Sequence, residues 1–164
     1  MTLIRTATAA DWPAVWPIFQ AVVAAGDTYA YPTDLTSDEA RRLWLAEAPG
    51  ATVVAVDDDG AVIGTAKMGP NRPGNGDHVG TASFMVAEAA RGHGAGRAMG
   101  KYVVQWHREN GYHAIQFNAV VESNAAAVAL WQSLGFRIIG TVPEAFRHPT
   151  DGLVGLHVMY LRLG

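Results

Sequence analysis

The chain has 164 residues, of which 49% are apolar, enough for one domain with its own hydrophobic core. The formal net charge of -3 argues against a nucleic-acid partner bound through bulk positive charge. The chain has no cysteine, which excludes disulfides and thiolate nucleophiles or ligands. No segment resembles a signal peptide or reaches the length of a membrane span. We therefore expect a single cytoplasmic domain over residues 1–164, without a membrane or nucleic-acid partner.

The first part of the chain predicts a strand, two helices and a hairpin. Two capping-box patterns mark helix starts, Thr8-x-x-Asp11 (with Asp in place of Glu) and Thr36-x-x-Glu39. Pro13 and Pro17 are unfavourable inside the first of these helices. We expect strands at residues 2–6, 51–56 and 61–68, and helices from Thr8 to near Ala25 and from Thr36 to near Glu47.

The second part alternates strands and helices. Helical spacing of apolar residues after Gly94 and after Asn124 predicts two helices, which end at Gly111 and Gly135. The segment PEAFRHPTDG (143–152) predicts a loop. Strands are expected at residues 78–86, 113–121, 136–142 and 154–163, which makes the chain a mixed α/β domain.

The segment from Phe84 to Lys101 reads FMVAEAARGHGAGRAMGK, in which a short strand leads into three glycines and a helix. The first amides of a helix lack partners inside the helix, and the helix dipole favours an anion there. Glycine lets the backbone approach a ligand closely, and Arg91 and Arg97 add positive charge. The segment predicts a phosphate or pyrophosphate site, although glycines that only turn the chain give the same pattern.

Two common phosphate motifs do not match this segment. The dinucleotide pattern G-x-G-x-x-G fails, because Arg97 or Met99 stands where the third glycine belongs. The P-loop pattern fails because Ala95 replaces its first glycine and Tyr102 follows Lys101. Neither motif therefore identifies a ligand for this loop.

The residues Arg91-Gly92-His93-Gly94-Ala95-Gly96 resemble the acyl-CoA loop of the GNAT (GCN5-related) N-acetyltransferases, [RQ]-x-x-G-x-[GA]. A second pattern of that family is matched downstream by Asn124, Ala127, Leu130, Trp131, Gly135 and Phe136. The order of elements matches as well, so the resemblance covers nearly the whole chain. It implies a mixed, mostly antiparallel sheet of about seven strands with four helices, in which the fourth and fifth strands splay apart.

The resemblance implies acetyl-CoA as cosubstrate. The chain has no H-x-x-x-H or H-E-x-x-H pattern, so no metal site is expected. The pyrophosphate would lie on the amides of residues 91–96, and the pantetheine arm would pair with the fourth strand as an added strand. Asn124 would bond the pantetheine arm, cap its helix, or do both. The expected cosubstrate residues are Phe84, Met85, Val86, Arg91, Gly92, His93, Gly94, Ala95, Gly96, Arg97, Asn124 and Trp131.

Acetyl transfer needs a neutral amine, a donor for the oxyanion and stabilisation of the leaving thiolate. The backbone N–H of Val86 is the expected oxyanion donor. Many family members carry a tyrosine as general acid where this chain has Trp131, and an indole N–H is no useful acid. Trp131 is thus expected to be core or cavity wall, and Glu122 and Glu144 are unplaced candidate bases.

Two segments are expected to meet the acceptor. The loop 26–32 contributes Tyr29 and Tyr31, which either line the site or staple the loop to the core. The fifth strand carries Asn118 on the same face as Gln116, and Asn118 orients the acceptor or makes an ordinary strand–loop bond. Arg147 and His148 are further candidate contacts.

The sequence is also similar to a narrower group, the proline-analogue (azetidine-2-carboxylate) N-acetyltransferases. Asn118 and Asn124 match two site asparagines of that group, and Thr81 and Ser83 are the candidates for a third polar residue. A small amino acid or amino-acid analogue is therefore the favoured acceptor. The alternatives are a protein or peptide N-acetyltransferase and a non-catalytic acyl-CoA-binding module, and a homodimer is common among relatives.

Overall fold

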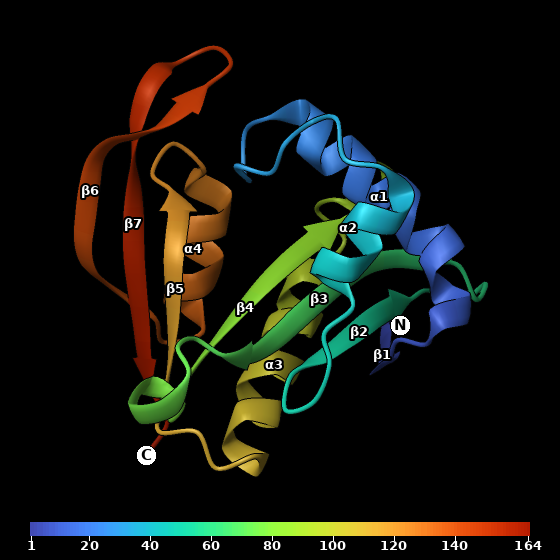
Figure 1. Ribbon diagram of the computed structural model, residues 1–164, viewed down its shortest axis with the longest axis horizontal. Coiled ribbons are helices and arrows are strands. Elements are labelled where there is room, and N and C mark those ends of the chain that lie inside the picture. Colours follow the sequence, from blue (N-terminus) through green and yellow to red (C-terminus); the bar gives the residue numbers. More distant parts are fainter.

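The computed structural model describes all 164 residues, which form one seven-stranded sheet with four α-helices (Figure 1). The strand order is β1-β2-β3-β4-β5-β7-β6. This confirms the predicted mixed α/β fold and its element order. The elements are β1 (Leu3–Thr6), α1 (Trp12–Ala25), α2 (Ser37–Trp44), β2 (Ala51–Val56), β3 (Val62–Pro70), β4 (Val79–Val86), α3 (Ala95–Glu109), β5 (Ala114–Val121), α4 (Ala125–Ser133), β6 (Arg137–His148) and β7 (Gly152–Arg162).

The sheet consists of two parts that meet at a short parallel seam. All neighbouring strands are antiparallel except β4 and β5. Those two strands pair only at Val79 with Ala114 and at Gly80 with Ile115. Beyond Gly80 they diverge, as Figure 1 shows, so the expected splay is confirmed. The backbone edges that face this gap have no neighbouring strand.

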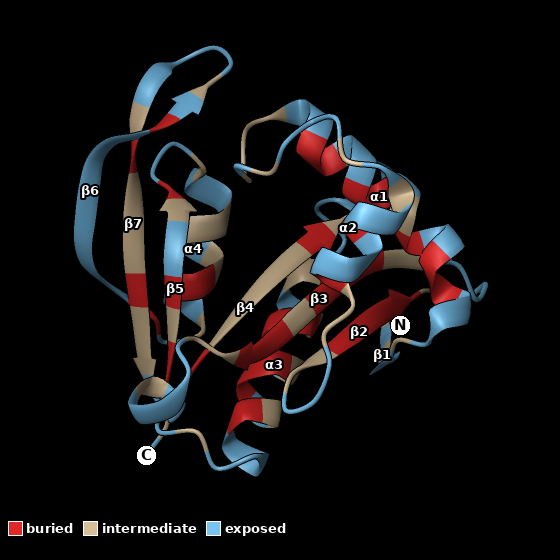
Figure 2. Ribbon diagram, viewed as in Figure 1, coloured by how far each residue is buried: buried red, intermediate tan, exposed pale blue.

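Helices cover both faces of the first part of the sheet. Alternate residues of β2 point to opposite faces, so Val54 packs with α1 and α2 while Val53 packs with α3. A third cluster joins α4 to β5 and β7, around Phe117, Trp131 and Met159. Figure 2 shows buried residues concentrated along β2, β3 and the inner sides of α1 and α3. The second and third clusters meet at Ala82 and Phe84 of β4, which pack against both.

Hydrogen bonds to Asp11 hold the start of helix α1 in place. Asp11 accepts a hydrogen bond from the Thr8 N–H at 2.7 Å, and the Arg5 guanidinium donates to both carboxylate oxygens of Asp11 at 2.8 Å. These donors hold the pKa of Asp11 well below its usual range. Pro13 lies in the first turn, where a missing N–H costs nothing, and the helix continues through Pro17.

Two predicted boundaries are wrong. The helix predicted to reach Glu47 ends at Trp44, because Leu45 takes an extended conformation. The segment 143–152 was predicted to be a loop, but most of it belongs to β6, which runs to His148 and forms a hairpin with β7. The pairing of β6 with β7 is interrupted by a register shift between Val142 and Phe146, where Glu144 has a positive φ of 52°.

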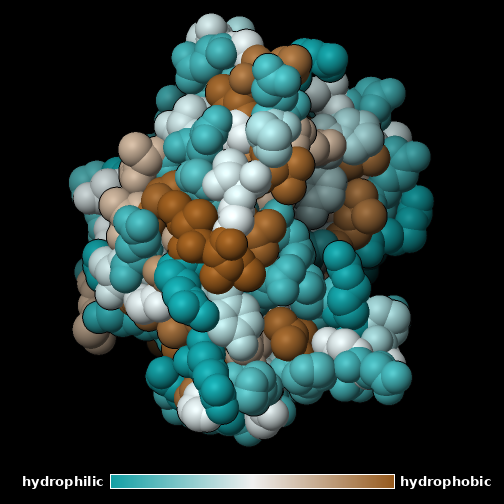
Figure 3. Space-filling model, turned by 90° about the vertical axis from the view of Figure 1, so that its left-hand side faces the viewer, coloured by the Kyte–Doolittle hydropathy of each residue, from teal (hydrophilic) through white to brown (hydrophobic).

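The edge strand β6 is exposed along most of its length. Figure 3 views the molecule from the β6 side and shows hydrophobic residues gathered on that surface. The exposed large apolar side chains on β6 and the start of β7 are Ile138, Ile139, Val142 and Leu153. None of the helices is long and apolar enough to cross a membrane.

Candidate active site

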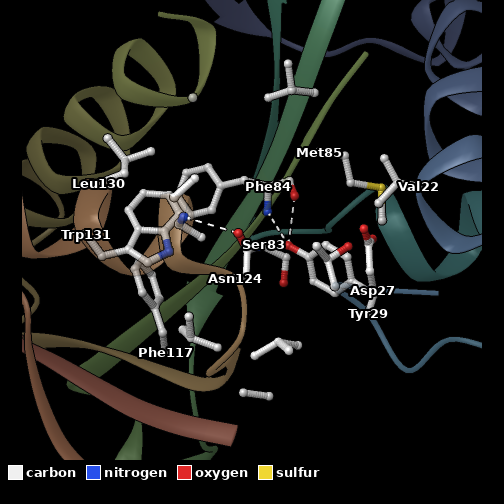
Figure 4. Close-up of a pocket in the computed structure, with 18 of the residues that line it drawn as sticks. Val22, Asp27, Tyr29, Ser83, Phe84, Met85, Phe117, Asn124, Leu130 and Trp131 are labelled. Carbon is white, nitrogen blue, oxygen red and sulfur yellow. Dashed lines mark hydrogen bonds between the residues drawn. The ribbon is translucent and has the colours of Figure 1, made fainter. Parts of the chain in front are cut away.

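The gap between β4 and β5 opens into a cavity of about 840 Å³. Its wall comes from four places: β4, the glycine loop with the start of α3, β5 with α4, and the loop after α1. The tip of the β6–β7 hairpin closes one side through Phe146 and His148. Figure 4 shows the central part, where aromatic side chains face the polar groups of the α1 loop. The volume and the mixed lining are typical of a small-molecule site.

The glycine loop turns the chain from β4 into α3. Gly92 and Gly94 have φ values of 78° and 89°, in the left-handed region that other residues rarely adopt. Gly94 is the N-cap of α3, so the next amides have no helical partner and are free for an anion. A Cβ added to either glycine would meet no atom within 4 Å, so the space above them is open. Arg91 and Arg97 line the same part of the cavity.

The β4 edge carries the groups expected to pair with a cosubstrate. Ala87 donates its N–H to Ile63 on β3 at 2.8 Å, so the N–H of Val86 points the other way, toward the gap. The backbone groups of Phe84 lie on the same side as those of Val86. Phe84, Met85 and Val86 all line the cavity.

The hydroxyl of Tyr29 is hydrogen-bonded to the backbone of Phe84 on this open edge of β4. It accepts the Phe84 N–H and donates to the Phe84 carbonyl, both at 2.8 Å (Figure 4). Burial raises the pKa of Tyr29 well above its usual value, so the phenol stays protonated. The loop after α1 is therefore attached to the strand at the open edge, which places Tyr29 on the cavity wall, as predicted.

Trp131 is both core and wall. It is only 7% exposed, and its ring lies 4.6 Å from that of Phe84 and 5.0 Å from that of Phe117. It also lines the cavity. Since Phe84 is on β4 and Phe117 on β5, Trp131 fills the space between the diverging strands.

The two asparagines of β5 and α4 make hydrogen bonds inside the protein. Asn118 lines the cavity, donates to Asn71 Oδ1 at 2.6 Å and accepts from Gln116 at 2.9 Å, so Gln116 and Asn118 share a face as predicted. Asn124 accepts the Ala127 N–H at 3.3 Å and caps α4, as expected. The amide nitrogen of Asn124 remains available for a ligand on the cavity wall.

Some predicted residues lie off the cavity wall. Tyr31 packs on Phe19 and Tyr29, which makes it a staple of the loop. The Glu122 carboxylate accepts the Gly155 N–H at 2.6 Å and so holds β5 to β7. The other residues named from the sequence that do not line the cavity are Thr81, His93, Glu144 and Arg147. Ser83 and His148 do line it.

Sequence reasoning missed several wall residues. Regular strand alternation would put Phe117 on the face opposite Asn118, but a register shift follows Phe117 in β5, and both residues line the cavity. Phe146 was missed because residues 143–152 were predicted to be a loop, and Leu156 was missed because nothing singled it out within the strand predicted at 154–163. Asp27 and Thr28 lie in the predicted acceptor loop, yet nothing in their spacing singled them out.

Comparison with curated proteins links the chain to small-molecule acetyltransferases. It is 33% identical over 147 residues to an L-methionine sulfoximine/L-methionine sulfone acetyltransferase of Pseudomonas aeruginosa, a match that covers 86% of this chain and 83% of the relative. It is 24% identical over 139 residues to the N-acetyltransferase aca1 of Schizosaccharomyces pombe, of which it spans 66%.

Solved structures share the whole fold. A GCN5-related N-acetyltransferase from Kribbella flavida is 58% identical with a TM-score of 0.97, over 99% of this chain and 98% of the other. A ribosomal-protein-alanine N-acetyltransferase from Brucella melitensis is 30% identical with a TM-score of 0.83, over 98% and 99% of the two chains. A phosphinothricin acetyltransferase from Sinorhizobium meliloti, in complex with acetyl-CoA, is 25% identical with a TM-score of 0.89, over 99% and 89%.

The model of the acetyltransferase (GNAT) family matches residues 13–136, which include the glycine loop, the open β4 edge and the whole of α4. The expected resemblance is thereby confirmed, and the chain belongs to the GNAT family of acetyltransferases.

Proposed function

We propose that this protein transfers the acetyl group of acetyl-CoA directly to the primary or secondary amine of a small molecule, an amino acid or an amino-acid analogue. The observation that carries the proposal is one cavity of about 840 Å³ with the unpaired amides of a helix start at one end and a polar loop at the other. The similarity to methionine sulfoximine and phosphinothricin acetyltransferases supports this class of acceptor.

The cosubstrate would lie along the gap between the strands. Its pyrophosphate would accept hydrogen bonds from the amides after Gly94, with Arg91 and Arg97 beside it. The pantetheine arm would pair with the free edge of β4 as an added strand. The acetyl-CoA complex of the phosphinothricin acetyltransferase supports this cosubstrate.

The chemistry needs few protein groups. The Val86 N–H, which points into the gap, would donate to the thioester oxygen and hold the tetrahedral oxyanion. The neutral amine attacks the carbonyl carbon, the C–N bond forms, and the C–S bond breaks. The proton from the attacking nitrogen ends on the CoA thiol. Holding thioester and amine together supplies much of the rate.

The test is thiol release from acetyl-CoA over a panel of amines, with CoA binding measured in parallel. The panel contains azetidine-2-carboxylate, L-methionine sulfoximine, phosphinothricin, a polyamine, an aminoglycoside and a lysine peptide. We expect turnover with at least one of the first three. Tight CoA binding without any turnover would favour the non-catalytic module instead.

A second candidate is transfer to a protein N-terminus. The similarity to a ribosomal-protein-alanine N-acetyltransferase favours it. A peptide beginning with alanine, added to the same panel, separates the two candidates. Higher catalytic efficiency on that peptide than on every amino-acid analogue would overturn the small-molecule proposal.

We also propose that the protein forms a homodimer through the exposed β6 surface. An exposed edge strand with apolar side chains is a natural pairing surface. Ile139 is 52% exposed there. Light scattering after size exclusion should give a dimer for the wild type and a shift toward monomer for Ile139→Lys. A wild-type monomer at tens of micromolar would overturn the proposal.

A further inference from the structure

Two oxygen atoms of the loop after α1 are buried without a partner. Asp27 Oδ1 and Thr28 Oγ1 have no hydrogen bond within the protein, whereas the hydroxyl of the next residue, Tyr29, has two. Both residues line the cavity, and Figure 4 shows Asp27 beside Tyr29 at the end away from α4. Buried oxygens without partners are costly, so such a pair on a cavity wall indicates that a ligand supplies the missing donors.

Asp27 also has no oppositely charged partner within the protein. It is the only acidic residue on the cavity wall, where the other charged or titratable side chains are Tyr29, Arg91, Arg97 and His148. Asp27 forms no salt bridge with any residue of the chain. The two arginines lie at the glycine loop. The cavity therefore has a cationic end for phosphate and, at the other end, one unpaired carboxylate.

The end of α1 adds to the negative potential at Asp27. The helix ends at Gly26, which takes the left-handed conformation at φ 69°, and Asp27 follows directly. The last carbonyls of a helix carry a partial negative charge that favours cations. No basic residue lies in the last turn of α1 to offset it. The site thus lacks both an internal counter-charge and an internal hydrogen-bond donor.

We propose that Asp27, with Thr28, binds the protonated amine of the acceptor and selects acceptors that are cationic at nitrogen in water. This inference deepens the proposed function and rests on it for the identity of the acceptor. The ligand class is an aliphatic primary or secondary ammonium group on a small molecule. An ammonium group supplies two or three N–H donors, which can bond to Asp27 Oδ1 and Thr28 Oγ1. Its positive charge balances the unpaired carboxylate of Asp27. Asp27 is then a specificity residue that touches the acceptor, and the bound ammonium group must release one proton to water before the neutral amine attacks the thioester.

The charge requirement can be isolated with a matched pair of ligands. Azetidine-2-carboxylate and cyclobutanecarboxylate share ring size and carboxylate, but only the first has a ring NH₂⁺ group. Titration calorimetry with the CoA-saturated protein measures both ligands without turnover. We compare the wild type with Asp27→Asn, which keeps the shape and removes the charge. Asp34→Asn is the control, because Asp34 is an exposed residue of the same inter-helix segment and lies off the cavity wall.

We expect the wild type and Asp34→Asn to bind azetidine-2-carboxylate at least about tenfold tighter than cyclobutanecarboxylate, equivalent to about 1.4 kcal/mol. Asp27→Asn should lose this preference. Asp27→Asn should also raise the KM for the acceptor about tenfold or more, which is the loss expected when an ion pair worth about 1.4 kcal/mol is removed. The affinity for CoA should change by no more than a factor of about two.

The proposal fails if Asp27→Asn keeps the preference, or if the wild type shows none. Turnover of the amine panel is read separately. If the amine panel is turned over and Asp27→Asn still prefers azetidine-2-carboxylate, Asp27 does not bind the ammonium group, and the proposed function stands. If the preference depends on Asp27 but no amine is turned over, Asp27 binds the ammonium group, and the proposed function is wrong.

Discussion

The hydroxyl of Tyr29 bonds to both backbone groups of Phe84, each at 2.8 Å, and so joins a loop to a strand edge 55 residues further along the chain. That edge is where the pantetheine arm is proposed to pair. The same hydroxyl would therefore compete with the cosubstrate for the Phe84 N–H and C=O.

Tyr29→Phe tests this competition. We expect the free energy of unfolding to fall by about 1–2 kcal/mol, because one buried hydroxyl with two partners is lost. CoA should bind several-fold tighter to the variant, because nothing has to leave the Phe84 backbone. Chemical denaturation and calorimetry measure the two effects. Weaker CoA binding by Tyr29→Phe would contradict the competition and place the hydroxyl in contact with the cosubstrate.

Gly94→Val tests the anion site. The branched side chain of valine would enter the open space above the start of α3. Valine also rarely adopts the φ of 89° that position 94 requires. We expect CoA affinity to fall at least about tenfold. Gly60→Val is the matched control, because Gly60 has a similar φ of 83° and an equally open surrounding in the β2–β3 turn. Equal loss of CoA affinity in both variants would show that only backbone strain matters.

Trp131→Phe tests whether the indole N–H takes part in the reaction. The side chain packs against Phe84 and Phe117, so its truncation should destabilise the protein by about 1–3 kcal/mol. Because an indole is no useful acid, we expect kcat to remain within a small factor of the wild type. A fall of a hundredfold or more in kcat, with the fold intact by circular dichroism, would make the indole part of the catalytic machinery.

Asn118→Ala separates an acceptor contact from a structural one. Asn118 bonds to Asn71 at 2.6 Å, and Asn71 does not line the cavity. If Asn118 contacts the acceptor, Asn118→Ala should lower kcat/KM by about tenfold or more, a typical cost of one lost polar contact, and leave CoA affinity unchanged. Asn71→Ala should have a much smaller effect. Equal losses in the two variants would make Asn118 a structural residue.

His107 should make stability depend on pH. Its ring is fully buried and bonds to the Val103 carbonyl at 2.8 Å, and burial lowers its pKa below the ordinary 6.5. The unfolded chain therefore takes up a proton before the folded protein does. Stability is complete above pH 6.5 and falls below it, by up to about 1.4 kcal/mol per pH unit. Urea denaturation from pH 7.5 to 5.5 should show this slope, and His107→Gln should flatten it.

Local patterns were sufficient for most of the fold. The capping box at Thr36, the glycine loop before α3 and the helical spacing after Asn124 each act within a few residues, and each predicted its element. The length of β6 could not be predicted in the same way. Pro143 and the positive φ of Glu144 interrupt the strand, and only pairing with β7 carries it on to His148.

The candidate site likewise has features that local patterns predict and features that depend on long-range contacts. The anion loop and the wall positions of Tyr29 and Asn118 follow from motifs. The hydrogen bonds of Tyr29 to Phe84 and of Asn118 to Asn71 join residues 55 and 47 positions apart, so no local pattern contains them. The missing partners of Asp27 and Thr28 are a property of the folded surroundings and appear only once the loop is packed.

The short seam between β4 and β5 has a consequence for cooperativity. Only two residue pairs join the backbones of the two halves of the sheet, and side chains such as Phe84 and Trp131 make the remaining contact between them. A ligand that pairs with β4 while it packs against Trp131 would act as the missing central strand. Ligand binding should then raise the melting temperature and sharpen the unfolding transition. Amide hydrogen exchange should slow on both sides of the gap at once, including at groups the ligand never touches.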